Sequence, residues 1–174
     1  MNSVSMCKIN YIKDIDVKNI KPSRSGAIVY TLYKNKIYFI LGIDTKSGDI
    51  TDFGGGVSLK REDVITGGLR ELSEESLGIF GNISKDEVKN CLAVYDENNI
   101  IIFIRIDIDI TSKYHEFKSR LKCVNNPEVK DIKFYDKKNF IDLFEGNSVG
   151  NIMYDRIRNL LSTAKNKYEF LRYL

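Results

Sequence analysis

The stretch DFGGGVSLKREDVITGGLRELSEESLGIF, residues 52–80, joins a glycine run to a dense cluster of charge. Three glycines stand at 54–56, and four of the six residues from Arg70 to Glu75 are charged. Three of those four are glutamates, at positions 71, 74 and 75. Like charges three or four residues apart on a helix repel each other by about 0.2–0.5 kcal/mol per pair. Such a cluster calls for a compensating partner.

The apolar spacing around this cluster predicts a helix over residues 63–77. Ile65, Leu69 and Leu72 recur at positions i, i+4 and i+7, which is the spacing of one buried helical face. Gly78 stands where a glycine often ends a helix. At 100° per residue, the three glutamates fall within an arc of about 100° beside the apolar face.

A hard divalent cation fits such an acidic face, because Mg²⁺ prefers carboxylate oxygens. Glycines 54–56 let the backbone approach closely, and a free carbonyl there could complete the coordination. The alternative is a solvated acidic surface, which is what most clusters of this kind are. Gly67 and Gly68 count against it, because glycine inside a helix costs up to about 1 kcal/mol relative to alanine. Close packing of the helix on a sheet would explain them.

The rest of the sequence predicts strands followed by helices in one domain. Two hairpins are expected, over 25–44 with a turn at 34–36, and over 91–110 with a turn at 96–99. In the second hairpin, isoleucines alternate with charged residues from 104 to 110, which predicts a strand with one wet face. Further predicted elements are a helix or loop over 112–123, a strand over 129–136, and helices over 137–146 and 150–174. The fold class is therefore mixed α and β.

Composition limits the class of protein. The 174 residues suit a single domain, and the net charge of +3 permits an anionic ligand without demanding nucleic acid. No apolar run is long enough to cross a membrane, and the N-terminus has no apolar signal region. Three cysteines without paired spacing argue against disulfides or a zinc cluster. We therefore expect an intracellular, cytoplasmic and reduced protein with no membrane partner.

The spacing resembles the signature of the Nudix hydrolase family, G-x5-E-x7-R-E-U-x-E-E-x-G-U, where U is a bulky aliphatic residue. Gly56 and Glu62 are separated by five residues, and seven more lead to Arg70-Glu71-Leu72-Ser73-Glu74-Glu75. One position departs from the pattern: Leu77 stands at the family's glycine, and Gly78 follows one residue late. The detailed resemblance covers about 25 residues.

This resemblance implies a fold, a cofactor and a reaction. The fold would be a single-domain α/β/α sandwich with a mixed β-sheet, over residues 26–174, after an N-terminal lead segment, 1–25. The cofactor would be Mg²⁺ or Mn²⁺. The reaction would be hydrolysis of a diphosphate linkage in a substrate of the type nucleoside diphosphate-X, by metal-activated water.

The resemblance also assigns roles to residues. The metal ligands would be Glu71, Glu74, Glu75 and a backbone carbonyl of Gly55 or Gly56. Glu62 and Arg70 would orient the cluster, with Arg70 paired to a neighbouring carboxylate.

The general base has several candidates. Glu71 or Glu74 could take the proton from water within the motif. Glu128 is another candidate, because it follows an Asn-Asn-Pro loop signal and precedes a predicted strand. Glu97 is more typical of a turn residue. His115, the only histidine, is expected on the surface, and a single histidine excludes a zinc–histidine cluster.

Substrate contacts are predicted from position alone. Arg24 and Lys60 would contact phosphates at the mouth of the site, and Phe53 would stack on a base. The partner is expected to be a small diphosphate, most naturally a nucleotide. Two other functions stay open. An mRNA-decapping enzyme would bind an RNA cap through a basic groove, and a Nudix-fold binding or regulatory protein would have lost catalysis.

Overall fold

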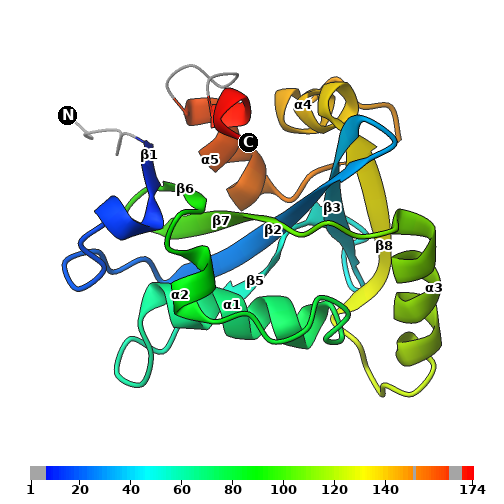
Figure 1. Ribbon diagram of the computed structural model, residues 1–174, viewed down its shortest axis with the longest axis horizontal. Helices are drawn as coiled ribbons and strands as arrows, with labels where there is room; N and C mark the ends of the chain where they lie inside the picture. Colours follow the sequence, from blue (N-terminus) through cyan, green and yellow to red (C-terminus); the bar gives the residue numbers. More distant parts are fainter. Residues whose placement is uncertain (1–6, 151, 165–169) are drawn as a thin grey trace.

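The computed structural model describes residues 7–150, 152–164 and 170–174. A sheet runs through the middle of the molecule, with helices on both sides (Figure 1). The elements are, in order, β1 (Lys8–Tyr11), η1 (Ile12–Asp14), β2 (Arg24–Tyr33), β3 (Lys36–Asp44), β4 (Ile50–Thr51), β5 (Phe53–Gly56), α1 (Val64–Glu75), α2 (Lys85–Val88), β6 (Leu92–Tyr95), β7 (Asn99–Arg105), α3 (Ile110–Leu121), β8 (Val129–Asp136), α4 (Lys137–Glu145), α5 (Asp155–Thr163) and η2 (Phe170–Tyr173).

The sheet is mixed, as predicted. Within the described residues it has eight strands in the order β1-β6-β7-β2-β3-β4, with β5 paired to β2 and β8 paired to β3. β2 and β7 run parallel, whereas the other pairs are antiparallel. β2 lies at the centre. One of its edges pairs with β7 over residues 24–30, and the other is shared between β5 over 24–27 and β3 over 29–33.

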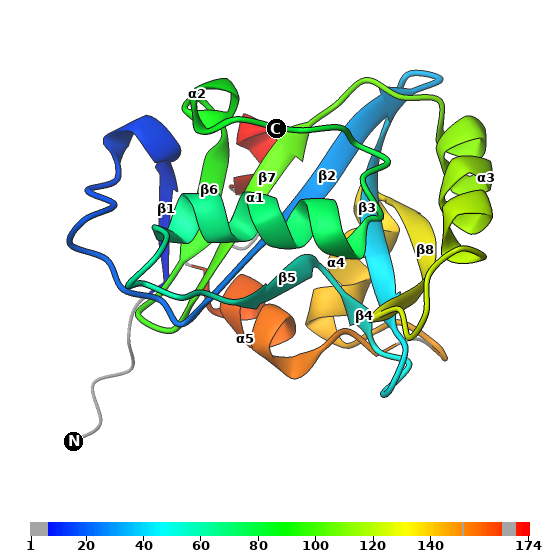
Figure 2. The same ribbon diagram turned by 90° about the horizontal axis from the view of Figure 1, so that it is seen from below.

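Alternate residues of the central strands face two separate hydrophobic layers. On β7, Ile100 and Ile102 pack into the layer under α1, whereas Ile101 and Phe103 pack into the layer under α4 and α5. This is the period-two pattern of a strand buried on both faces. Figure 2 shows α1 covering one face, with α4 and α5 behind the sheet. The predicted single-domain α/β/α sandwich is therefore confirmed.

Both predicted hairpins form, but the second is shorter than expected. β7 ends at Arg105, and residues 106–109 lie outside the strands and helices before α3 begins at Ile110. Asp109 ends this segment by capping α3, because its Oδ1 accepts a hydrogen bond from the Ser112 N–H at 2.8 Å. The side-chain cap thus starts a helix where the sequence pattern predicted more strand. His115 lies on α3 and is exposed, as predicted.

The C-terminal helix is also shorter than the prediction of 150–174. Within the described residues of that range, α5 covers Asp155–Thr163 and η2 covers Phe170–Tyr173. Residues 151 and 165–169 lie outside the described residues. In the described part of the chain, no helix has the length and apolarity needed to cross a membrane. β1 pairs with β6 in the main sheet; a domain boundary at residue 25 stays a prediction.

Candidate active site

Helix α1 carries the acidic cluster and forms where the sequence predicts it. Asp63 caps its N-terminus, with Oδ1 accepting from the Thr66 N–H at 2.9 Å. Ile65 and Leu72 are buried in the layer under the helix. Glu71 and Glu75 lie against the glycine strand β5, whereas Glu74 is exposed beside Arg70.

Helix α1 is followed by two residues with left-handed backbones, Leu77 and Gly78. Leu77 and Gly78 both adopt left-handed backbone conformations, with φ of 57° and 70°. The Gly78 N–H donates to the Ser73 carbonyl at 2.8 Å, which closes the last turn. Leu77 thus takes up the conformation that favours glycine, at the position where the family signature has one.

Glycines let α1 and β5 approach the sheet and each other closely. A Cβ built on Gly68 would lie 2.4 Å from Ser25 Oγ, and one built on Gly55 would lie 2.7 Å from the Glu71 carboxylate. Real Cβ atoms do not approach other atoms so closely. The predicted close packing at the helix glycines is confirmed, and the backbone of Gly55 lies directly against a carboxylate.

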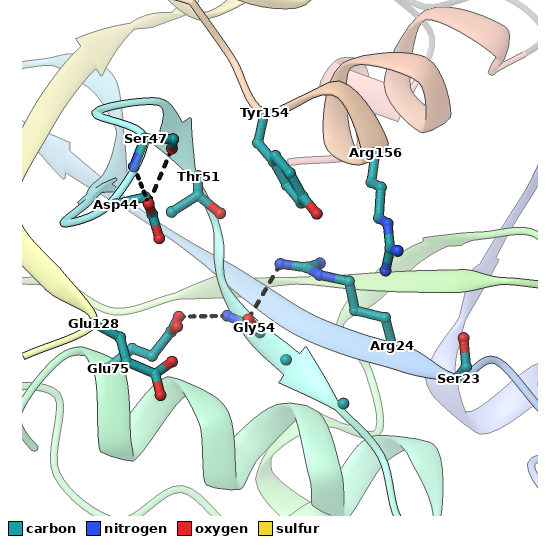
Figure 3. Close-up of a pocket in the computed structure, with 12 residues that line it drawn as sticks. Ser23, Arg24, Asp44, Ser47, Thr51, Gly54, Glu75, Glu128, Tyr154 and Arg156 are labelled. Carbon is teal, nitrogen blue, oxygen red and sulfur yellow. Dashed lines mark hydrogen bonds between the residues drawn. The ribbon is translucent and has the colours of Figure 1, made fainter.

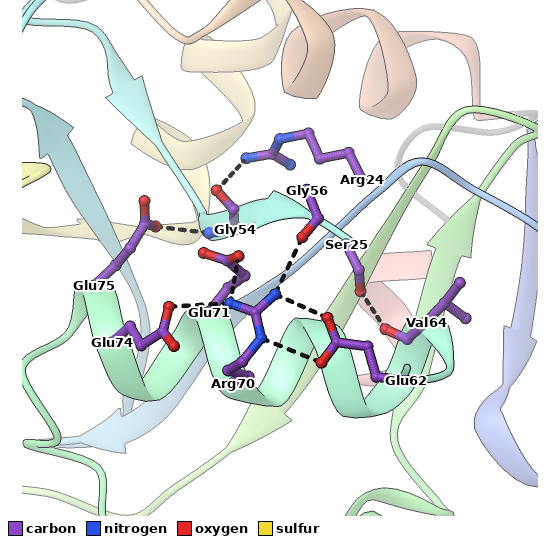
Figure 4. Close-up of polar contacts among 10 residues, drawn as sticks. All are labelled: Arg24, Ser25, Gly54, Gly56, Glu62, Val64, Arg70, Glu71, Glu74 and Glu75. Atoms are coloured by element: carbon purple, nitrogen blue, oxygen red, sulfur yellow. Dashed lines mark hydrogen bonds and ion pairs between the residues drawn. The ribbon is translucent and has the colours of Figure 1, made fainter. Parts of the chain in front are cut away.

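Arg70 joins most of the acidic residues in one network, drawn in Figure 4. Its Nη2 lies 2.9 Å from Glu62 Oε1 and 3.1 Å from the Gly56 carbonyl oxygen. Its Nη1 lies 2.8 Å from Glu71 Oε1 and 3.0 Å from Glu74 Oε2. The predicted pairing of Arg70 with neighbouring carboxylates is present, and it ties the helix to the glycine strand.

Glu75 has a different environment from the other glutamates. Its Oε2 accepts a hydrogen bond from the Gly54 N–H at 2.7 Å, and within the described residues no cationic side chain pairs with it. Burial and the negative charges of Asp52, Glu71 and Glu128 together raise the pKa of Glu75 to about 9, although the hydrogen bond from Gly54 opposes the rise. An isolated carboxylate of this kind favours binding of a proton or another cation.

The carboxylate of Glu71 is also largely shielded from solvent. Only 8% of its surface is exposed, and burial raises its pKa above the ordinary value even though Arg70 opposes that rise. Burial therefore outweighs the ion pair with Arg70 at Glu71, and Glu75 has no such ion pair among the described residues.

Glu128 joins this group from the loop before β8, 53 positions after Glu75 in the sequence. It lines a cavity of about 200 Å³ together with Glu71, Glu74 and Glu75. With Glu75 it also lines a second cavity of about 400 Å³, the main cavity, shown in Figure 3. The structure thus brings Glu71, Glu74, Glu75 and Glu128 together, whereas Glu97 lies in the β6–β7 turn and lines neither cavity. Their chemical roles stay predictions.

The carboxylate and carbonyl oxygens of the site suit a hard divalent ion, although they do not converge on one metal position. Carboxylates and a backbone carbonyl are the oxygen ligands that Mg²⁺ prefers. In the described part of the chain, no three acidic, histidine or cysteine side chains are already arranged to hold a metal ion. Arg70 forms ion pairs with two of the predicted ligands, Glu71 and Glu74. Metal binding would require these carboxylates to turn away from it.

Of the three predicted substrate residues, only Arg24 lines the main cavity. Its guanidinium pairs with the buried Asp52 at 3.0 Å and donates to the Gly54 carbonyl at 3.2 Å, so it also positions the glycine strand. Lys60 is exposed in the loop before α1 and lines neither cavity. The stacking role of Phe53 is wrong, because its ring has 0% exposure and lies in the core under α1.

Sequence reasoning missed the residues on the opposite wall of the main cavity. Tyr154 and Arg156 reach it from the start of α5, as Figure 3 shows. The Tyr154 ring centroid lies 5.8 Å from the Arg24 guanidinium carbon. This wall is fixed by a parallel bridge between Ile50 and Met153. No local signal announces a pairing across about a hundred residues, so the sequence pattern of α5 indicates only an amphipathic helix.

Comparisons with known proteins give fold-level similarity. No protein-family model and no curated protein matches the sequence. Among solved structures, an Ap4A hydrolase of C. elegans in a binary complex is similar, with 17% identity, a TM-score of 0.49, and 87% of this chain and 98% of that chain covered. The NUDIX domain of Shewanella oneidensis NrtR, complexed with ADP ribose, has 12% identity, a TM-score of 0.48, and coverage of 93% and 94%. A NUDIX-family hydrolase from Clostridium perfringens has 14% identity, a TM-score of 0.43, and coverage of 85% and 96%. At these identities and scores, similarity alone does not place the chain in a family.

Proposed function

We propose that the protein is a Mg²⁺- or Mn²⁺-dependent diphosphohydrolase that cleaves a nucleoside diphosphate-X substrate. The observation that carries this proposal is the set of Glu71, Glu75 and Glu128 beside the partly exposed backbone of glycines 54–56, in which only Glu71 has a cationic partner among the described residues. A divalent ion would supply that charge, and a diphosphate is a ligand that such an ion brings with it.

The residues would divide the work as follows. Glu71, Glu74, Glu75 and the Gly56 carbonyl would hold the ion, which neutralises the diphosphate and acidifies bound water. Arg70 would hold Glu71 and Glu74 until the ion binds, and its own position would be kept by Glu62. The position of Gly55 explains why a side chain is excluded there: it would collide with Glu71.

Glu128 is the best candidate for the general base. Its carboxylate lines both cavities, and among the described residues it has no ion-pair partner. Glu71 and Glu74 are both engaged by Arg70. A carboxylate that is free to accept a proton beside the reacting phosphorus meets the geometric demand on a base. Arg156, on the opposite wall, would contact the phosphate that leaves.

One observation favours a second candidate, a diphosphate-binding protein without hydrolysis. Arg70 contacts three of the four proposed ligands, Glu71, Glu74 and the Gly56 carbonyl, and no three carboxylates converge in the described residues. The decapping alternative gains less support. The cations of α3 are already paired, because Lys113 and Arg120 contact Glu116 and Lys118 contacts Asp131.

The deciding test is hydrolysis of a panel of diphosphates with Mg²⁺ or Mn²⁺, against the same reactions with chelator. The panel includes nucleoside triphosphates, dinucleoside polyphosphates, nucleotide sugars and capped RNA. Metal-dependent cleavage is expected for at least one class. If a diphosphate binds with metal and none is cleaved, the second candidate is correct.

A further inference from the structure

A single residue of a neighbouring turn holds the backbone on both sides of Glu128. The Thr45 hydroxyl donates to the Pro127 carbonyl at 2.7 Å, and the Thr45 N–H donates to the Glu128 carbonyl at 2.8 Å. Thr45 directly follows β3, whereas Pro127 and Glu128 end the loop that leads into β8. The two carbonyls belong to the two peptide groups that flank the Glu128 α-carbon. Thr45 therefore fixes the backbone from which the Glu128 side chain projects.

The turn that carries Thr45 is itself closed by short-range hydrogen bonds. Asp44 Oδ1 accepts from the Ser47 N–H at 2.6 Å and from the Ser47 hydroxyl at 2.9 Å. The Asp44 N–H donates to the Asp49 carbonyl at 2.9 Å. An aspartate that binds the backbone just after it in this way stabilises a local turn. Figure 3 shows Asp44 and Ser47 on the same side of the main cavity as Glu128. Thr45 thus belongs to a rigid support for the loop.

A β-bulge anchors the chain on the other side of Glu128. The register between β3 and β8 shifts at the start of β8, where Lys130 is an extra residue. Val129 and Ile132 are separated by an odd number of positions, yet both are buried in the layer under α1. A regular strand would turn them to opposite faces, and the bulge corrects for this. Glu128 is therefore held between a buried neighbour and the two hydrogen bonds from Thr45.

The carboxylate of Glu128 has no support of its own. Its residue is exposed, and among the described residues the side chain forms no hydrogen bond or ion pair. A general base must lie within hydrogen-bonding reach of the water whose proton it takes. The position of this carboxylate therefore depends on the backbone that carries it, and Thr45 holds that backbone.

We propose that Thr45 is a positioning residue for the general base Glu128. Its hydroxyl would keep the Glu128 carboxylate at the main cavity without touching the substrate, because Thr45 lines neither this cavity nor the one beside Glu74. This role rests on the diphosphohydrolase activity proposed above and adds to it a residue from outside the site.

A double-mutant cycle between Thr45 and Glu128 tests this role. Thr45→Val removes the hydroxyl and keeps the branched shape of the side chain. It should lower kcat about three- to tenfold, the loss expected when one hydrogen bond no longer favours the competent loop, and change KM by less than about twofold. Thr45→Ser keeps the hydroxyl and should restore the parental kcat. In a Glu128→Gln background, Thr45→Val should have no further effect, because the base that it positions is already absent.

The same substitution at another exposed threonine provides the control. Thr111 lies in the first turn of α3 and lines neither cavity, so Thr111→Val should keep the parental kcat. All variants are assayed as the complete chain with Mg²⁺ on one substrate, the member of the diphosphate panel that the parent hydrolyses fastest, beginning with ATP and Ap4A. Thermal melts check that each variant is folded.

Hydrogen exchange gives a second readout that needs neither metal nor substrate. The N–H of residue 45 donates to the Glu128 carbonyl, so a loosened loop exposes it to solvent. In Thr45→Val this amide should exchange about three- to tenfold faster, after correction for the intrinsic rate of valine, whereas the Leu41 amide in β3 should keep its parental rate. Unchanged exchange at residue 45 would overturn the role of Thr45 even if kcat falls.

The kinetic outcomes separate this role from the proposed function. Parental kcat in Thr45→Val, or the same fold loss with and without the Glu128 carboxylate, would overturn the role of Thr45 and leave the diphosphohydrolase in place. Full turnover in Glu128→Gln would also overturn it, because there would be no base to position. If the parent hydrolyses no member of the panel, the proposed function itself is wrong, and the role of Thr45 is lost with it.

Discussion

The two faces of the sheet are built on opposite principles. Under α4, large rings fill the layer, with Phe39 and Phe140 stacked at a centroid distance of 4.2 Å. Under α1, close approach matters instead, and Gly68 leaves room for Ser25 Oγ. The aromatic face supplies buried area and therefore stability, whereas the glycine face fixes where the carboxylates lie. Mutations on the two faces should therefore have separable effects.

The largest effect on stability is expected on the aromatic face. Phe140→Ala should lower the free energy of unfolding by about 3–5 kcal/mol, because it removes a fully buried ring from a packed layer. Chemical denaturation measures this change. The kcat of the folded fraction should stay at the parental value.

Leu72→Ala, under α1, should lower the free energy of unfolding by about 2–5 kcal/mol and also lower kcat. Equal kcat losses in the two variants would contradict the division between the faces.

The largest effect on activity is expected at Glu75. Glu75→Gln should lower kcat by at least about a hundredfold and change KM far less, the scale of losing one preorganised electrostatic contact. Steady-state kinetics on whichever diphosphate is cleaved measures both constants. Glu87→Gln is the matched control, because Glu87 caps α2 through a capping box that glutamine also supports. Parental turnover in a folded Glu75→Gln protein would remove the metal assignment.

Gly68 links the two kinds of effect. Gly68→Ala should destabilise by about 1–3 kcal/mol, because the new methyl group collides with Ser25 Oγ. Activity should fall as well, since α1 must move away from the sheet and carries the carboxylates with it. Adding Ser25→Ala removes the colliding oxygen, so the double variant should recover part of both losses in a double-mutant cycle. Strictly additive losses would mean that this contact does not position α1.

The pKa of Glu75 predicts how stability depends on pH and metal. The folded, metal-free protein holds a proton on Glu75 up to a pKa of about 9, whereas the unfolded chain releases it near 4.5. The folded state therefore binds more protons between these values, and its stability should fall as pH rises through them. Thermal melts should show a Tm that decreases from pH 6 to pH 8.5, and Glu75→Gln should make this dependence of Tm on pH weaker.

Millimolar Mg²⁺ should raise Tm more at the higher pH. A Tm that rises with pH in the parent but not in Glu75→Gln would contradict the assignment.

The smallest expected effect compares the ends of α1 and α4. Gly78 and Gly146 both follow helices with left-handed backbones, at φ of 70° and 77°. Alanine at either position should cost about 1 kcal/mol in unfolding free energy. A Cβ on Gly78 would also lie 3.1 Å from Arg120 Nη1, whereas one on Gly146 meets nothing within 4 Å. Gly78→Ala should therefore cost slightly more, and an equal cost would show that Arg120 moves freely.

The sequence by itself determined where α1 forms and which charged side chains it carries. The apolar spacing, the cap at Asp63 and the charged positions are all encoded within about 25 residues, because helical geometry relates neighbours along the chain directly. Glycines 54–56 and 67–68 carried a second local signal, since glycine is unfavourable in a helix or strand unless another group needs the space.

Only the tertiary structure decided what faces this cluster. Phe53 has an aromatic ring that could stack on a base, yet its position on β5 places the ring in the core. Arg24 pairs with Asp52, and Tyr154 and Arg156 reach the main cavity through a bridge pairing between distant segments. Such pairings depend on the register of the whole sheet, which no single segment encodes. The sequence therefore specified the acidic half of the candidate site, and long-range packing specified the half that would select the substrate.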